Sequence, residues 1–197
     1  AALGAWILWL GWFGFNGGSE LKVSEVSSAT AVSQVFLNTN MAAAGGVVAT
    51  LFMSLFLTGK MDVTMAINGA IAGLVSITAD PLSPTGGTAV LVGALGGALV
   101  YVSILFLEKK GIDDPVGAIS AHGTVGIYGV LVVSLTGGAD FLGQLTGVVM
   151  IAAFTYIASL GVIYAINFVM PIRATDEEQD AGLDISEVGI EAYPEFD

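Results

Sequence analysis

The sequence predicts an all-α protein of the polytopic helical membrane class. Of its 197 residues 55% are hydrophobic and only 11% are charged, and the mean hydropathy is +0.85, outside the balance of a soluble domain. Stretches near the length of about 20 apolar residues that a bilayer crossing requires recur along the chain. We expect spans near residues 3–18, 30–57, 63–79, 88–107, 115–135 and 141–170, which together form one bundle over residues 1–172.

These runs are apolar on all sides and rich in Ala, Leu, Ile and Gly. Strands of a membrane barrel would instead alternate with a two-residue period over segments of about 10 residues. The chain has 27 glycines, several of them four residues apart inside the spans, as in Gly69 to Gly73 and Gly93 to Gly97. Small residues at this spacing let helices approach closely in lipid, so we expect most of these glycines to serve packing.

The first span ends in the segment from Gly11 to Ser19, which is rich in aromatic residues and glycine. Two polar residues close it, Asn16 and Ser19. Their side chains could cap the helix, or could line an external vestibule for a cation beside the aromatic rings. The residues alone leave both interpretations open.

The fifth span carries His122, the one histidine of the chain. Ahead of it, Asp113, Asp114 and Pro115 have the composition that a helix N-terminus favours. An ionisable group inside a membrane helix is a candidate for function, because a central charge costs about 2.5–3.5 kcal/mol to insert. A neutral imidazole both donates and accepts a hydrogen bond, which suits the passage of a small polar solute. The alternative is a packing histidine bonded to a backbone carbonyl, and composition alone slightly favours it.

The connections between spans give an orientation. Lys22 falls on one side of the membrane, whereas Lys60, Lys109, Lys110 and Arg173 fall on the other, which the positive-inside rule makes cytoplasmic. The tail of residues 173–197 is then cytoplasmic, and it holds nine of the 17 acidic residues. A solvated, disordered tail and a docking segment are both open, because apolar residues interrupt its charge.

The sequence does not contain the residues that several classes of function require. The chain has no cysteine, no Gly-x-Ser-x-Gly sequence, no pair of intramembrane aspartates and no metal-ligand cluster. We therefore expect no enzyme activity, no cofactor, no metal and no nucleic-acid partner. Because the chain begins at Ala1 rather than Met, we expect a fragment or a processed product.

Five motifs carry a resemblance to a known family. They are GWFGFNGGSEL at 11–21, NTNMAAAGG at 38–46, GAIAGLVSIT at 69–78, DDPVGAISAHGTVGIYG at 113–129 and GLDISEVGIEAY at 182–193. In this order they resemble the ammonium transporter family, which includes the methylammonium permeases and the Rhesus proteins. The chain is similar to the last six of that family's eleven membrane helices together with its cytoplasmic tail.

The resemblance implies a homotrimer in the cell membrane, in which each subunit has an apolar pore between two inverted repeats. It implies that Phe15 is one of two gating phenylalanines, that Ser19 helps to hold ammonium at the outer mouth, and that His122 is one of two histidines at mid-pore. It also places Leu8, Trp12 and Ile71 along the passage. Transport of ammonium, ammonia or methylammonium is the implied activity, and an ammonium sensor with little transport is the alternative.

The resemblance extends to the tail, and it has limits. It implies a regulatory tail motif, which in bacteria works with the PII signalling protein, formed by Gly182, Leu183, Asp184, Glu187, Gly189 and Tyr193. Gly117 stands where the family often has Asp, and Val188 where its tail often has His. The family's first five helices, with the partner histidine and the second gating phenylalanine, lie outside this chain.

Overall fold

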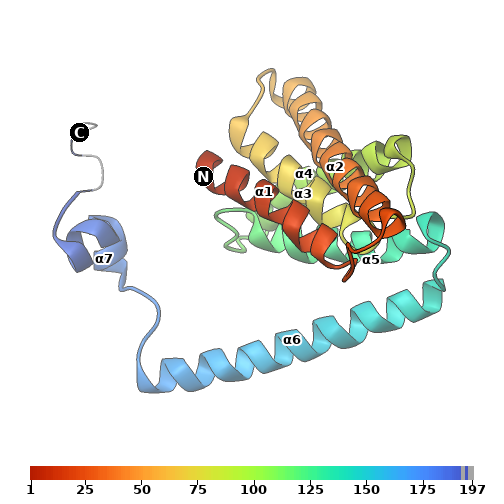
Figure 1. The fold of residues 1–197 in the computed structure, drawn as a ribbon. Helices are drawn as coiled ribbons and strands as arrows, with labels where there is room; N and C mark the ends of the chain where they lie inside the picture. The colour runs from red at the N-terminus through yellow and green to blue at the C-terminus, as the bar shows by residue number, and fades with distance from the viewer. Residues whose placement is uncertain (192–193, 195–197) are drawn as a thin grey trace. The chain divides into compact units, whose positions relative to one another are not determined.

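Six helical segments occupy the places of the six predicted spans in the computed structural model (Figure 1), which describes residues 1–191 and Pro194. No strand occurs among these described residues. The elements are α1 (Ala2–Gly18), α2 (Val26–Thr58), α3 (Val63–Ile77), α4 (Gly86–Lys109), the π-helix η1 (Ile119–Thr124), α5 (Val125–Thr136), α6 (Phe141–Val169), α7 (Asp176–Ala181) and the π-helical turn η2 (Asp184–Val188).

Within the described part of the chain, four helical segments are long and apolar enough to cross a membrane. They are α2, α4, α6 and the continuous helix Ile119–Thr136 that η1 and α5 form. α1 has 17 residues and α3 has 15. At about 1.5 Å per residue α3 is about 22 Å long, which is shorter than the hydrocarbon core of a bilayer, about 30 Å thick. The predicted all-α, polytopic membrane class is confirmed, whereas separate crossings by α1 and α3 stay predictions.

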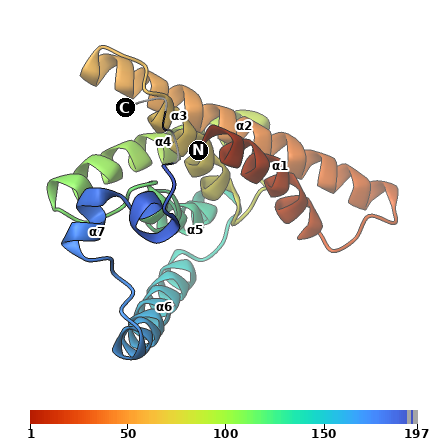
Figure 2. The same cartoon turned by 90° about the vertical axis from the view of Figure 1, so that its left-hand side faces the viewer.

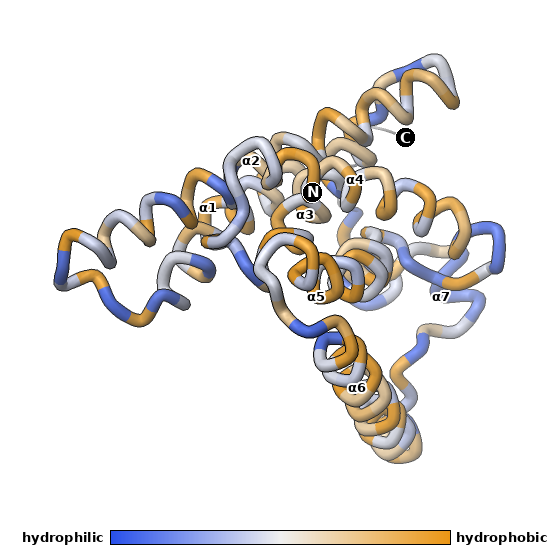
Figure 3. The backbone as a smooth tube through the Cα atoms, turned by 90° about the vertical axis from the view of Figure 1, so that its right-hand side faces the viewer, coloured by the Kyte–Doolittle hydropathy of each residue, from blue (hydrophilic) through white to orange (hydrophobic). Residues whose placement is uncertain are grey.

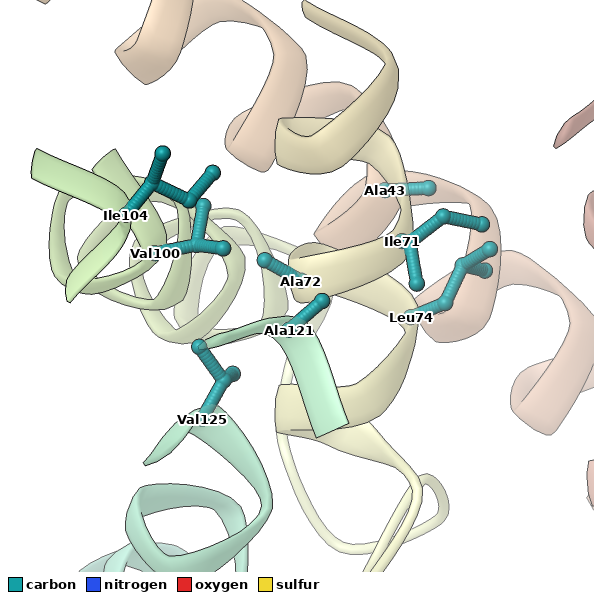
Figure 4. Close-up of a cluster of buried hydrophobic side chains, with 8 residues drawn as sticks. All are labelled: Ala43, Ile71, Ala72, Leu74, Val100, Ile104, Ala121 and Val125. Carbon is teal, nitrogen blue, oxygen red and sulfur yellow. The ribbon is translucent and has the colours of Figure 1, made fainter. Parts of the chain in front are cut away.

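The chain divides into two compact units, Ala1–Val148 and Val149–Asp197, with the boundary inside α6. In the first unit α2, α3 and α4 pack on one another, α1 lies on α2 and α3, and η1 lies on α3 and α4. Figure 2 shows the same four helices, α1 to α4, from a second direction. A buried core of this unit is drawn in Figure 4 and comes from five elements: Ala43 of α2, Ile71, Ala72 and Leu74 of α3, Val100 and Ile104 of α4, Ala121 of η1 and Val125 of α5.

Glycine allows the closest of these helix contacts. A Cβ atom added to Gly93 would meet the backbone of Ala42, and one added to Gly73 would meet that same backbone. α4 and α3 therefore both lie directly against α2, and the packing role predicted for these glycines is confirmed. Gly14 and Gly18 differ, because a Cβ atom at either position would have no neighbour within 4 Å.

The helix in the fifth predicted span, near residues 115–135, begins at Ile119. Residues 115–117 form a turn and bend, and the π-helix starts at Ile119. Gly117 has a φ of 72°, a left-handed conformation that a helix does not continue through. Pro115 therefore lies in the turn that precedes the helix, and not in the first turn of the helix itself.

The second unit contains the greater part of α6 and the acidic tail. α6 is apolar along its length, as Figure 3 shows, whereas the segment around α7 is largely hydrophilic. α7 begins with a capping box, in which the Thr175 hydroxyl accepts from the Glu178 amide and the Glu178 carboxylate accepts from the Thr175 amide. The described part of the tail is thus folded into two short helical segments, α7 and η2.

Candidate functional site

His122 lies on η1 with its ring against Trp12 of α1. The two rings are stacked, with centroids 6.3 Å apart and 14° between their planes. Ala121 and Val125 on the same helical segment are buried in the core, while the His122 side chain is exposed in this chain. Burial of Ala121 and Val125 therefore fixes the rotation of this helix about its own axis, and that rotation directs the imidazole toward α1.

Two hollows meet at His122. The first, of about 320 Å³, is lined by Leu8, Ile71, Asn68, Ala118 and His122 among others; we call it the Leu8 hollow. The second, of about 330 Å³, is lined by Trp12, Phe15, Val75, Thr78, His122 and Gly126 among others; we call it the Phe15 hollow. His122 contributes to both, so a solute moving from one hollow to the other would pass the imidazole.

Trp12 is held by a hydrogen bond at the end of α3. Its indole Nε1–H donates to the Thr78 hydroxyl over 2.7 Å, and that hydroxyl donates to the Leu74 carbonyl over 2.6 Å. Thr78 is the C-cap residue of α3, directly after Ile77. One hydroxyl therefore joins the end of α3 to the aromatic ring that stacks on His122.

Phe15 and Ser19 lie at the end of α1. Phe15 lines the hollow named after it and is 64% exposed in this chain. The Ser19 hydroxyl donates to the Phe15 carbonyl over 2.7 Å, which is a helix-capping contact. Ser19 is not among the residues that line the Phe15 hollow, so its predicted role in recruiting a cation stays a proposal.

Asn16 has neither of the roles that the sequence left open for it. Its side chain is only 2% exposed, and its amide Nδ2 donates to the Thr39 hydroxyl over 3.0 Å. Asn16 therefore ties α1 to α2 in the interior. Capping and vestibule roles are both wrong, because the side chain points between the helices rather than to the helix end.

The π-helix that carries His122 is fixed at its start by Asp114. One carboxylate oxygen accepts from the Ile119 amide over 2.8 Å and the other from the Ser120 amide over 3.0 Å. Partial burial alone would raise the pKa of Asp114, but these amide hydrogen bonds outweigh it and hold the pKa below its ordinary value. The predicted role of Asp114 at a helix N-terminus is confirmed.

One further hydrogen bond holds this helix in place, and a close approach precedes it. The hydroxyls of Thr124 on η1 and Ser103 on α4 are hydrogen-bonded at 2.9 Å. At Gly117 an added Cβ atom would meet the side-chain oxygen of Asn68 on α3. The absence of a side chain at Gly117 leaves room for Asn68, and both residues line the Leu8 hollow.

Five of the six predicted pore residues thus line the two hollows: Leu8, Trp12, Phe15, Ile71 and His122. Sequence reasoning missed Thr78, Asn68 and Val75, which line them too. Thr78 carried a usable signal, because it is a hydroxyl residue at the end of an apolar span. Asn68 carried another, since a side-chain amide one turn inside an apolar segment requires a partner or a function.

The tail residues of the predicted regulatory motif lie in and around η2. Gly182 and Gly189 have φ values of 89° and 75°, and the Ser186 hydroxyl donates to the Gly182 carbonyl over 3.0 Å. Leu183, Asp184 and Glu187 lie between them, whereas Tyr193 is outside the described residues. Over residues 1–191 and Pro194, no group of three or more His, Asp or Glu side chains is arranged to hold a metal ion.

Apolar helices of membrane-crossing length define a multi-pass membrane protein. His122, on one of these helices, lines two hollows that form a candidate solute passage. The chain belongs to the ammonium transporter family, whose sequence pattern matches residues 1–193. It is 35% identical, over its whole length, to Ammonium transporter Amt2 of Archaeoglobus fulgidus and 34% identical, over 97% of its length, to the Ammonium transporter of Bacillus subtilis.

Solved structures show the same similarity. A Sensor Amt protein superposes with a TM-score of 0.81 at 37% identity over 94% of this chain. Mep2 of Candida albicans superposes with a TM-score of 0.79 at 27% identity over 90% of this chain. The chain spans about half of its relatives, namely 46% and 50% of the two transporters and 48% and 43% of the two solved chains.

Proposed function

We propose that a whole protein containing this chain moves ammonium or ammonia, and methylammonium, across the cell membrane, and that this chain supplies one wall of the passage. The observation that carries the proposal is the position of His122, which lines both the Leu8 hollow and the Phe15 hollow. Membership of the ammonium transporter family supports the choice of substrate. The role is transport rather than catalysis.

The lining of the hollows suits this solute. Phe15 and Trp12 present aromatic faces, which attract a small cation before it loses its water. His122 follows, and a neutral imidazole can accept a proton from ammonium or donate a hydrogen bond to ammonia. Leu8 and Ile71 continue the passage with apolar surface. A hydrated potassium ion would lose its hydration there without compensation, so selectivity follows from desolvation cost.

The passage needs a second wall. Leu8 and Phe15 are 50% and 64% exposed in this chain, and the chain spans about half the length of its relatives. We propose that the partner histidine and the second gating phenylalanine come from the part of the whole protein that corresponds to the rest of those relatives. Ser19, beyond Phe15 on the same helix, is proposed to contact ammonium at the outer mouth.

The experiment that tests transport is flux into proteoliposomes. The whole protein should acidify or alkalise the vesicle interior when ammonium is added outside, and should accumulate labelled methylammonium, at rates above those of empty vesicles. Flux equal to that of empty vesicles would contradict the proposal. A potassium gradient applied in the same vesicles gives the selectivity.

A second proposal concerns assembly and regulation, and membership of the family supports it. We propose a homotrimer in the plasma membrane with the tail of residues 173–197 in the cytoplasm, where the motif around η2 meets a PII-type signalling protein. Proteolysis of sealed vesicles from the cytoplasmic side should remove the tail, and mass measurement in detergent should give three subunits. Titration with purified PII should lower the flux, and truncation after Arg173 should abolish that effect.

Sensing is a second candidate. One solved relative is a Sensor Amt protein, and its 37% identity exceeds the 27% of Mep2 from Candida albicans. A sensor would bind ammonium, with a change in the tail, while moving little of it. Binding measured by calorimetry together with flux no greater than that of empty vesicles would favour sensing over transport.

A further inference from the structure

We infer that Thr78 is a positioning residue, which holds the Trp12 indole in the orientation that stacks on His122 and thereby sets the selectivity of the passage. This inference rests on the proposed transport function. Thr78 and Trp12 are 66 residues apart in the sequence, and a hydrogen bond joins their side chains. Both line the Phe15 hollow together with His122.

The hydrogen bonds give the Thr78 hydroxyl a fixed direction. It has a single hydrogen, which is donated to the Leu74 carbonyl over 2.6 Å. Its oxygen accepts from the Trp12 Nε1–H over 2.7 Å. Because the donor is already used on the backbone, the hydroxyl can act toward the indole only as an acceptor. The ring is therefore tied to the end of α3 at one defined atom.

The tie matters because the surroundings are apolar. An indole N–H in a dry site needs an acceptor, and an unpaired one is costly. Without the Thr78 hydroxyl the N–H would turn toward another acceptor, and the ring would leave its parallel arrangement with His122. Otherwise the N–H would stay in the hollow and bind the solute itself. Both outcomes change what a passing ammonium or methylammonium meets beside the imidazole.

The side chains allow this role to be separated from direct contact with the solute. If Thr78 acts through the indole, its hydroxyl has no influence once Trp12 lacks an N–H. Trp12→Phe keeps an aromatic ring and removes that donor. The double variant Trp12→Phe with Thr78→Val should then behave as Trp12→Phe alone, whereas a direct contact between Thr78 and solute would add a further change.

The test uses the whole protein in proteoliposomes and measures the ratio of ammonium flux to methylammonium flux. Thr78→Val should change this ratio roughly 2- to 10-fold, which corresponds to one hydrogen bond, and Thr78→Ser should restore it. Thr50→Val is the matched control, because the buried Thr50 hydroxyl also bonds to its own helix, at Gly46 and Val47. It should leave the ratio unchanged.

A spectroscopic measurement checks the positioning without transport. The ultraviolet Raman band that reports indole N–H hydrogen bonding is measured in wild type, Thr78→Val and Thr78→Ser. From each spectrum the spectrum of the same protein carrying Trp12→Phe is subtracted, which isolates the Trp12 signal. The band should shift in Thr78→Val and not in Thr78→Ser. An unshifted band, or a flux ratio in Thr78→Val equal to that of wild type, would overturn the inference while leaving transport intact. Wild-type protein without flux would overturn the proposed function and the selectivity role together.

Discussion

The ring of Trp12 lies parallel to the ring of His122, with 6.3 Å between the centroids and 14° between the planes. The contact joins the first helix of the chain to the fifth, across 110 residues of sequence. It also lies on the candidate passage, because Trp12 and His122 both line the Phe15 hollow and His122 lines the Leu8 hollow as well. Any substitution that moves η1 or the end of α1 should therefore act on the passage.

Gly117 gives the first prediction. Its φ is 72°, and an added Cβ atom would meet Asn68. Gly117→Ala should therefore lower stability by about 1–2 kcal/mol for the left-handed backbone, and by roughly 1–3 kcal/mol more for the contact. Thermal unfolding of the whole protein in detergent measures the loss.

Gly111 is the matched control for Gly117. It has a similar φ of 67° and no atom within 4 Å of an added Cβ. Gly111→Ala should therefore show the backbone cost alone. Asn68→Ala should recover part of the loss in Gly117→Ala and none of it in Gly111→Ala; equal losses at the two glycines would show that the Asn68 contact is not the cause.

Asp114 gives a prediction about pH. Its pKa is held below the ordinary value by amide hydrogen bonds despite the opposing effect of burial, so its contribution to stability is present above the unfolded pKa of 3.8. That contribution is lost as the pH falls through the lower pKa of the folded state. Asp114→Ala should lower stability at neutral pH by about 1 kcal/mol, as for the loss of a helix cap.

The measurement is the unfolding temperature as a function of pH. The difference between wild type and Asp114→Ala should be constant near neutrality and should shrink below about pH 4. Glu108→Gln, at an exposed carboxylate near the end of α4, should produce no such difference. A gap between wild type and Asp114→Ala that persists unchanged in strong acid would rule out the carboxylate as its source.

Gly93 tests the packing of α4 on α2. An added Cβ atom there would meet the backbone of Ala42, which has no rotamer to change, so Gly93→Ala should cost about 1–3 kcal/mol. Gly87 in the same helix has no atom within 4 Å of an added Cβ, and Gly87→Ala should not destabilise. Unfolding in mixed detergent micelles would give the two values, and equal behaviour would mean that α4 does not lie on α2 so closely.

Much of the fold could be predicted because its physical signal is strong. Uncharged apolar runs define where helices form in a membrane protein, and the six predicted spans are helical. The start of the fifth helix was misplaced because Asp113, Asp114 and Pro115 resemble a first turn in sequence. The left-handed backbone of Gly117 prevents these three residues from forming the first turn of the helix, and sequence alone does not reveal that backbone conformation.

The site could be predicted only through the family motifs. Composition left His122 between packing and function, and left Asn16 and Ser19 between capping and a vestibule. The structure shows Asn16 buried against Thr39, a contact between helices that no local pattern encodes. Thr78 was missed for the same reason, since its partner Trp12 is 66 residues away.

Substitution of His122 tests the central claim most directly. In the whole protein, His122→Ala should weaken discrimination between ammonium and potassium, and His122→Glu should alter selectivity or proton coupling, because each removes the neutral donor and acceptor where the two hollows meet. Ammonium and potassium currents are measured side by side on supported membranes containing equal amounts of protein. Changed current ratios in both variants are the expected result; currents that match wild type in both would contradict the assignment of His122 to the passage.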